Sequence, residues 1–109
     1  YVFNFKNQSM QTPYYAVIFT STRTELDENY SEMAIKMETL AKQQPGFLGV
    51  ESARNEIGIT VSYWESLEAI ANWKQDLDHL DAQFLGRQKW YENYVVRIAK
   101  VEKEYGFEK

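Results

Sequence analysis

The sequence predicts an α+β fold of the ferredoxin-like kind, in which two helices cover one face of a four-stranded antiparallel sheet. Three observations support this prediction. Four β-rich segments and two segments with helical spacing follow one another in the order β-α-β-β-α-β. A short turn, Asn55-Glu56, separates the two middle strands, as in a hairpin. No internal repeat or linker interrupts the 109 residues, so residues 14–109 are expected to form a single domain.

The first half of the chain contains a strand and a helix after an aromatic N-terminal segment. In residues 1–13 aromatic residues alternate with others, which predicts an N-terminal arm or an extra strand. Residues 14–22, YYAVIFTST, are rich in β-branched and aromatic residues and are predicted to form the first strand. In the predicted first helix, Asp27 is the expected N-cap and Pro45-Gly46 ends the helix. Its apolar residues at helical spacing are Tyr30, Met33, Ala34, Met37, Leu40 and Ala41.

The second half is expected to supply three strands and a helix. The strands are FLGVESAR at 47–54, IGITVSYW at 57–64 and YVVRIAKVE at 94–102. Ser66 is the expected N-cap of the second helix. The apolar stripe of this helix consists of Leu67, Ile70, Trp73, Leu77, Leu80 and Phe84.

The chain's one histidine, His79, lies in a polar stretch that allows two interpretations. If the helix is continuous from residue 67 to 85, His79 lies on the solvent face with Asp76. Alternatively, Asp78 caps a new helix with Asp81 at its third position, and His79 then occupies the first turn of that helix.

The first and last strands are apolar on both faces. In residues 14–19, for example, one face carries Tyr14, Ala16 and Ile18, and the other carries Tyr15, Val17 and Phe19. A sheet with helices on one side should be polar on the other, and monomers rarely expose a large apolar patch. The pattern therefore predicts a homodimer that forms through the uncovered sheet face.

Composition excludes several classes of function. The net charge of −4, with no basic block, argues against a nucleic-acid partner. The absence of cysteine excludes disulfides, thiolate nucleophiles and Cys-ligated metals. We found no apolar run of membrane-spanning length, no signal peptide, no phosphate loop and no Ser-His-Asp pattern. We therefore expect a cytoplasmic protein with no membrane partner and no native metal.

Three segments carry a family resemblance. QQPGFLGVES, VSYWESLEAIANWK and HLDAQFLGRQKWYENYVVRIAKVEKEY resemble the antibiotic-biosynthesis-monooxygenase (ABM) domain family over residues 14–105. The resemblance implies a dimeric α+β barrel with a ligand cavity between the helices and the sheet. The family includes cofactor-independent monooxygenases of polycyclic aromatics, quinol monooxygenases and haem-degrading enzymes.

The resemblance therefore implies a cofactor-independent monooxygenase that oxidises an aromatic or quinol-type small molecule. One alternative is a non-catalytic dimer that binds a small hydrophobic ligand. A third is a haem-binding or haem-degrading protein. This third reading is weaker, because Trp73 matches the haem-degrading pattern, whereas the ligating histidine would lie near Gln83 and the first strand has no matching Asn.

Eight residues are the candidate site residues. His79 and Arg97 are the candidate catalytic groups, for proton transfer and for stabilising negative charge. The structural alternative for Arg97 is a pair within the chain or at a dimer interface, with Glu51 as one candidate partner. The candidate substrate-binding residues, each of which also suits a core, are Tyr63, Trp64, Trp73, Phe84, Tyr91 and Tyr94.

Overall fold

The computed structural model describes residues 11–83 and 89–109, with the backbone alone for residues 80–83. The elements are β1 (Tyr14–Arg23), α1 (Tyr30–Gln43), β2 (Phe47–Arg54), β3 (Gly58–Trp64), α2 (Leu67–Gln83) and β4 (Tyr91–Val101). This order confirms the predicted β-α-β-β-α-β fold. Residues 1–10, most of the predicted N-terminal arm, lie outside the described residues.

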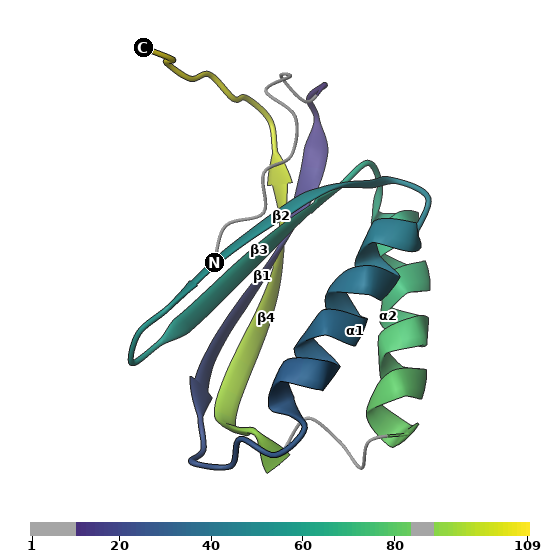
Figure 1. Cartoon of the computed structure of the whole chain (residues 1–109). Coiled ribbons are helices and arrows are strands. Elements are labelled where there is room, and N and C mark those ends of the chain that lie inside the picture. Colours follow the sequence, from purple (N-terminus) through teal and green to yellow (C-terminus); the bar gives the residue numbers. More distant parts are fainter. Residues whose placement is uncertain (1–10, 84–88) are drawn as a thin grey trace.

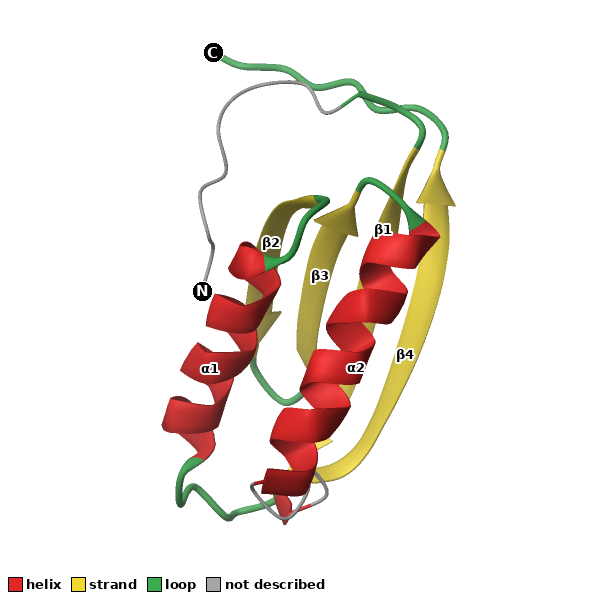
Figure 2. Cartoon of the chain, turned by 90° about the vertical axis from the view of Figure 1, so that its right-hand side faces the viewer, coloured by secondary structure: helices red, strands yellow, loops and turns green. Residues whose placement is uncertain are grey.

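The four strands form one antiparallel sheet in the order β2-β3-β1-β4, so β1 is central and β4 and β2 are the edges. Both helices lie on the same face of this sheet (Figures 1 and 2). Helix α1 packs on β2, and α2 packs on β3 and on α1. The prediction of helices on one face is therefore confirmed.

Strand register assigns each side chain to one of two faces, because successive residues of a strand point to opposite sides. Val17 and Trp64 pack with the helices, so the odd-numbered residues of β1 lie on the helix side, here called the inner face. In register with these are Ser62 and Thr60 of β3, and Tyr94, Val96 and Ile98 of β4. The other side, which neither helix covers, is called the outer face.

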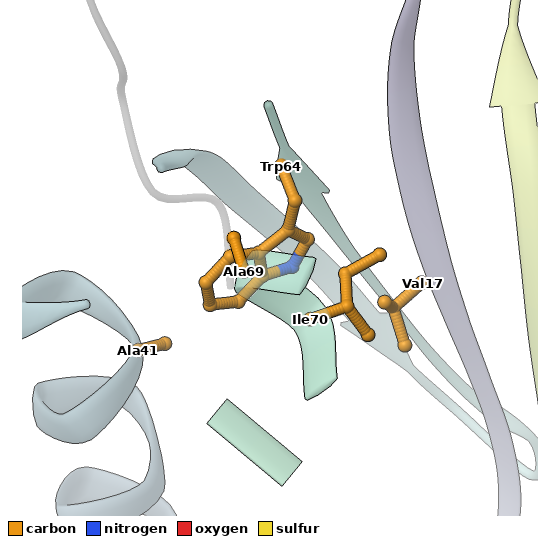
Figure 3. Packing of buried hydrophobic residues seen from close by; sticks show 5 residues of the cluster. All are labelled: Val17, Ala41, Trp64, Ala69 and Ile70. Carbon is orange, nitrogen blue, oxygen red and sulfur yellow. The ribbon is translucent and has the colours of Figure 1, made fainter. Parts of the chain in front are cut away.

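Two buried clusters hold the helices on the inner face. The first contains Trp64 with Val17, Ala41, Ala69 and Ile70, and Figure 3 shows the Trp64 ring among these smaller side chains. Small residues of the helices allow the helix backbones to approach the large indole ring. The second cluster contains Met33, Trp90 and Tyr91, with Phe19, Tyr30, Met37, Leu40 and Tyr94 packed against it.

Several element ends differ from the sequence-based expectations. The N-cap of α1 is Asn29, not Asp27, and it has a left-handed backbone with φ 64°. Asp27 instead forms an ion pair with Arg23 at 2.8 Å. The Ser66 hydroxyl accepts a bond from the Ala69 N–H at 3.0 Å, which confirms Ser66 as the cap of α2. Strand β4 begins at Tyr91, earlier than predicted.

Neither helix, over its described length, has enough apolar residues to cross a bilayer.

Candidate functional site

An apolar strip of the inner face lies uncovered along β4. Val96 and Ile98 point to the helix side, yet they are 48% and 53% exposed. Their register partners on β1 are Phe19 and Val17, and Tyr94 continues the strip beyond Val96. We call Tyr94, Val96 and Ile98, together with Phe19 and Val17, the β4 shelf. Val17 itself is buried, whereas Val96 and Ile98 form an exposed apolar surface, and such a surface is typical of a ligand or partner site.

A pair of tryptophans lies at one end of the β4 shelf, in the cluster that contains Val17. Trp64 ends β3 and is fully buried, and its ring centroid lies 4.8 Å from that of Trp73 on α2, with the rings nearly parallel at 29°. The Trp64 N–H donates to the Ser62 hydroxyl at 2.9 Å. The Trp73 Nε1 is buried and has no acceptor among the described residues. This N–H group without an acceptor therefore belongs to one of the two stacked rings.

Aromatic rings and hydroxyls surround the other end of the β4 shelf. Tyr94 stacks on Phe19 with ring centroids 5.2 Å apart, and Tyr91 meets Phe19 edge-on at 5.3 Å. The Tyr91 hydroxyl donates to the Tyr30 hydroxyl at 3.4 Å. Burial, followed by this hydrogen bond, raises the pKa of Tyr91 above its usual value. Tyr91 is therefore a neutral hydroxyl group at ordinary pH.

Two guanidinium groups lie at the same end. The guanidinium of Arg54 extends from β2 across Gly58 of β3 and donates to the Ser21 hydroxyl on β1. Only glycine permits this path, because a Cβ at position 58 would collide with the Arg54 guanidinium. Arg23 stacks over the Tyr30 ring at 3.5 Å. The positive charges of Arg54 and Arg23 favour the ionised form of Tyr91 and partly offset the effect of burial on its pKa.

Arg54 differs from Arg23 in its charge partners. Arg23 pairs with Asp27 at 2.8 Å, and its buried Nε has no acceptor within the described part of the chain. Among residues 11–79 and 89–109, no carboxylate lies within ion-pair distance of Arg54. The serine it contacts, Ser21, is 1% exposed and is in register with Tyr94. This end of the β4 shelf therefore offers positive charge to an anionic group.

Sequence reasoning did not identify Arg54, Arg23, Ser21 or Tyr30 as site residues. Each looks like an ordinary strand-end or helix residue in the sequence. The sequence did contain one signal for two of these residues. Side chains of a strand alternate between its faces, which places Ser21 and Arg23 on the same face as Val17 and Phe19.

The structure brings four of the predicted substrate-binding residues to the inner face and separates the others. Tyr94 is part of the β4 shelf, and Trp64, Trp73 and Tyr91 lie beside it. Tyr63 points to the outer face, where its hydroxyl donates to Glu51 at 2.8 Å. Phe84 lies outside the described residues. Binding of substrate by these side chains stays a prediction.

The two candidate catalytic residues lie away from the β4 shelf. Arg97 is exposed on the outer face, in register with Ile18. Helix α2 is continuous from Leu67 to Gln83, so the alternative with a break at Asp78 is wrong. His79 is exposed on this continuous helix, as the first interpretation requires. Asp78 forms an ion pair with Lys74 at 3.0 Å, and Asp76 accepts a bond from the Gln44 side chain at 2.6 Å.

The cavity expected between helices and sheet stays a prediction. Two hollows are formed by residues elsewhere in the described chain. One, of about 90 Å³, is lined by Leu26, Glu28, Asn29, Lys89 and Trp90. The other, an open hollow of about 300 Å³, is lined by Gln11, Thr12, Pro13, Leu48 and Glu65. The described residues contain no group of three or more acidic or histidine side chains placed to hold a metal ion.

Comparison with known proteins reveals one close sequence relative. No family model matches the chain. The uncharacterized protein YqjZ of Bacillus subtilis (strain 168) is 49% identical over 107 residues, which cover 96% of this chain and 94% of YqjZ.

Solved structures show the same fold at low sequence identity. SnoaB, a cofactor-independent oxygenase from Streptomyces nogalater, matches in a point-mutant form with a TM-score of 0.68 and 10% identity, over 84% of this chain and 95% of SnoaB. A candidate antibiotic biosynthesis monooxygenase from Nitrosomonas europaea matches with a TM-score of 0.64 and 10% identity, over 90% of this chain and 96% of that one. The ABM-like fold expected from the sequence is therefore confirmed.

Proposed function

Because the chain belongs to the same family as YqjZ of Bacillus subtilis and has the fold of the ABM proteins, we propose that it is a cofactor-independent monooxygenase. Its substrate is an aromatic or quinol-type small molecule that binds along the β4 shelf. The observation that carries the proposal is the buried Trp73 N–H, which has no acceptor among the described residues. The description of SnoaB as a cofactor-independent oxygenase supports the reaction type.

The Trp73 N–H supports a ligand with an oxygen atom beside a flat ring. A buried donor without an acceptor costs about 1–3 kcal/mol, and a bound phenolic or quinone oxygen would remove that cost. The partly exposed Trp73 ring, which stacks on the buried Trp64 ring, would provide an aromatic wall at the same place. Val96 and Ile98 would contact the apolar part of the ligand.

The positive end of the β4 shelf supports ionisation of the substrate. Arg54 lies there without a carboxylate partner among the described residues, and Arg23 is close by. These charges would stabilise a phenolate or enolate. The proposal thus gives Arg54 the role in charge stabilisation that the sequence suggested for Arg97, and it does not use His79.

The proposed reaction needs no reductant other than the substrate. The substrate anion transfers one electron to O₂, and the resulting radical pair combines to form a C–O bond. The peroxide anion takes up a proton, which balances the proton lost when the substrate ionised. Its O–O bond then breaks together with the C–H bond of the same carbon, and water leaves. A new carbonyl group remains, so one oxygen atom of O₂ enters the product and the other leaves as water. The protein's part is to orient the substrate and to stabilise its negative charge.

The experiment measures oxygen consumption with a panel of hydroquinones and hydroxylated polycyclic aromatics. Turnover is expected with one class of the panel, and Trp73→Phe should lower kcat/KM about 10- to 100-fold, since it keeps the ring stack and removes the N–H. Trp73→Phe should fold as stably as the parent chain, because the N–H has no partner to lose among the described residues. Full activity of Trp73→Phe contradicts the assignment, and saturable binding without oxygen consumption supports the non-catalytic binder instead.

We further propose that the protein is a homodimer that forms through the outer face. Ile59 and Val95 are 46% and 48% exposed there, and Ile18 and Val61 lie in the adjacent row of the sheet. This apolar patch supports the arrangement expected from the two-faced strands. Sedimentation equilibrium at micromolar concentration tests the proposal, and a monomer would contradict it.

A further inference from the structure

We propose that the two copies meet in one particular register, in which Arg97 of each copy pairs with Glu51 of the partner subunit. This inference rests on the homodimer proposed above and specifies its geometry. It depends on how the outer-face side chains are arranged in rows that run across the sheet.

Each of three outer-face rows has one residue from every strand, in the order β4, β1, β3, β2. The rows are Val95-Thr20-Ile59-Ala53, Arg97-Ile18-Val61-Glu51 and Ala99-Ala16-Tyr63-Gly49. Arg97 and Glu51 are the charged residues of these rows, and both lie in the middle row. One carries positive charge at the β4 edge, and the other carries negative charge at the β2 edge.

These two residues cannot pair within one chain. Three strand spacings separate β4 from β2, which puts their backbones about 14 Å apart. Ile18 and Val61 fill the row between them. Arg97 is exposed in the monomer, but a partner sheet would bury it among apolar residues, where an unpaired guanidinium is costly.

Glu51 is already held in place for an incoming partner. Its Oε1 accepts the Tyr63 hydroxyl at 2.8 Å, and this fixes the carboxylate on the outer face. A carboxylate has several lone pairs, so this bond leaves room for a guanidinium donor. The carboxylate is therefore ordered before binding, which reduces the entropy lost when the pair forms.

Two-fold symmetry turns this single row into two ion pairs. When two sheets pack face to face, the two-fold axis lies between them. An axis along the strands, midway between β1 and β3, exchanges the two edges of the sheet. Arg97 then faces Glu51 of the partner subunit, and Ile18 faces Val61 of the partner subunit. Packed sheets are about 10 Å apart, a gap that an Arg and a Glu side chain together can span.

The other in-plane axis gives an unfavourable arrangement. An axis across the strands, along the middle row, would place Arg97 opposite Arg97 of the partner subunit. Glu51 would likewise face the partner's Glu51. Like charges at a buried interface are strongly unfavourable, so the charges select the axis along the strands. With this axis, the positive end of the middle row in one copy faces the negative end of the same row in the other copy. The outer face is therefore complementary to the outer face of a second copy of this chain.

The test uses two charge reversals, Arg97→Glu and Glu51→Arg, and the dimer dissociation constant from sedimentation equilibrium at low ionic strength. Each variant alone places two like-charged pairs in its dimer and should raise the dissociation constant about tenfold or more. An equimolar mixture of the two variants should regain the dimer, since every reversed residue then faces an opposite charge. A pair within one chain would not respond to mixing.

Matched reversals outside the proposed contact provide the controls. Lys100→Glu lies on β4 but on the inner side, in register with Tyr15, and Glu56→Arg lies in the exposed β2–β3 turn. Both should dimerise like the parent chain. Arg97→Gln is a further variant that leaves the Tyr63–Glu51 bond intact, so it remains informative if Glu51→Arg does not fold. It should also weaken the dimer and reduce its sensitivity to salt.

The possible failures are distinguishable. A parent chain that is monomeric at micromolar concentration overturns the homodimer and this register with it. A dimeric parent whose charge-reversed variants stay dimeric, or whose mixture is no tighter than either variant, overturns the register alone. Oxygen consumption is measured separately, so a failure of the monooxygenase proposal does not affect this result.

Discussion

Trp64 and Trp73 stack on each other, but only the Trp64 N–H has an acceptor within the described chain. The two indoles come from different elements, the end of β3 and the second turn of α2. Trp64 is fully buried and Trp73 is partly exposed, and their N–H groups differ in having a partner. The hydrogen bond of Trp64 belongs to the fold, whereas the buried donor of Trp73 has no partner among the described residues.

Trp64→Phe and Trp73→Phe should therefore differ in stability. Trp64→Phe leaves the Ser62 hydroxyl, which is 3% exposed, without its donor and should lower the free energy of unfolding by about 1–3 kcal/mol. Trp73→Phe should change it by about 1 kcal/mol or less. Urea denaturation of both variants measures the difference, and equal losses would contradict this division of roles.

Gly46→Ala should destabilise the fold by about 1–3 kcal/mol. Gly46 has φ 90°, and an added Cβ would lie 2.8 Å from the Ala69 Cβ on α2. The turn after α1 would have to move away from the start of α2. Gly106→Ala is the matched control, because nothing in the described chain lies within 4 Å of the added Cβ there. Thermal unfolding of both variants is the measurement, and an unchanged midpoint for Gly46→Ala would refute the prediction.

Stability should fall at high pH because of Tyr14. Burial, then the hydrogen bond to Glu104 at 2.7 Å and the charges of Glu104 and Glu51, raise the pKa of Tyr14 to about 12. In the unfolded chain a tyrosine has a pKa of about 10. The folded state favours the protonated hydroxyl, so this contribution is complete below pH 10 and is lost as the pH rises from 10 toward 12.

Urea denaturation at a series of pH values measures this effect. Tyr14→Phe should flatten the decline above pH 10, although Tyr63 retains its share, because burial and Glu51 raise its pKa too. A decline with the same slope in Tyr14→Phe and the parent chain would show that Tyr14 does not cause it.

Arg54→Met should lower kcat about tenfold or more if Arg54 stabilises a substrate anion. Arg54 is exposed to water in the free protein, so the effect should be smaller than the roughly 100- to 1,000-fold loss typical of a fully enclosed donor. Lys36→Met, an exposed change on α1, is the charge-matched control and should keep full activity. Oxygen consumption at saturating substrate is the measurement, and equal activity of both variants would exclude the role.

Periodicity in the sequence was sufficient to predict the fold, but the site depends on register. The alternation in residues 14–22 and the helical spacing after Tyr30 reflect burial directly, so they predict element type well. The suggested break at Asp78 failed because capping is read from local sequence, whereas Asp78 pairs with Lys74 one turn earlier in a continuous helix. The position of Arg54 depends on how three strands align at Gly58, which no single segment of sequence encodes.

The central position of β1 also affects the order in which the fold can form during synthesis. β1 is the first of the four strands to leave the ribosome and β4 is the last, yet the two are neighbours in the sheet. Until residues 91–101 emerge, one edge of β1 lacks the strand that pairs with it in the finished sheet. Such an open edge can recruit strands from other chains. A nascent chain stalled before Tyr91 should therefore aggregate, and it should become soluble once β4 is added.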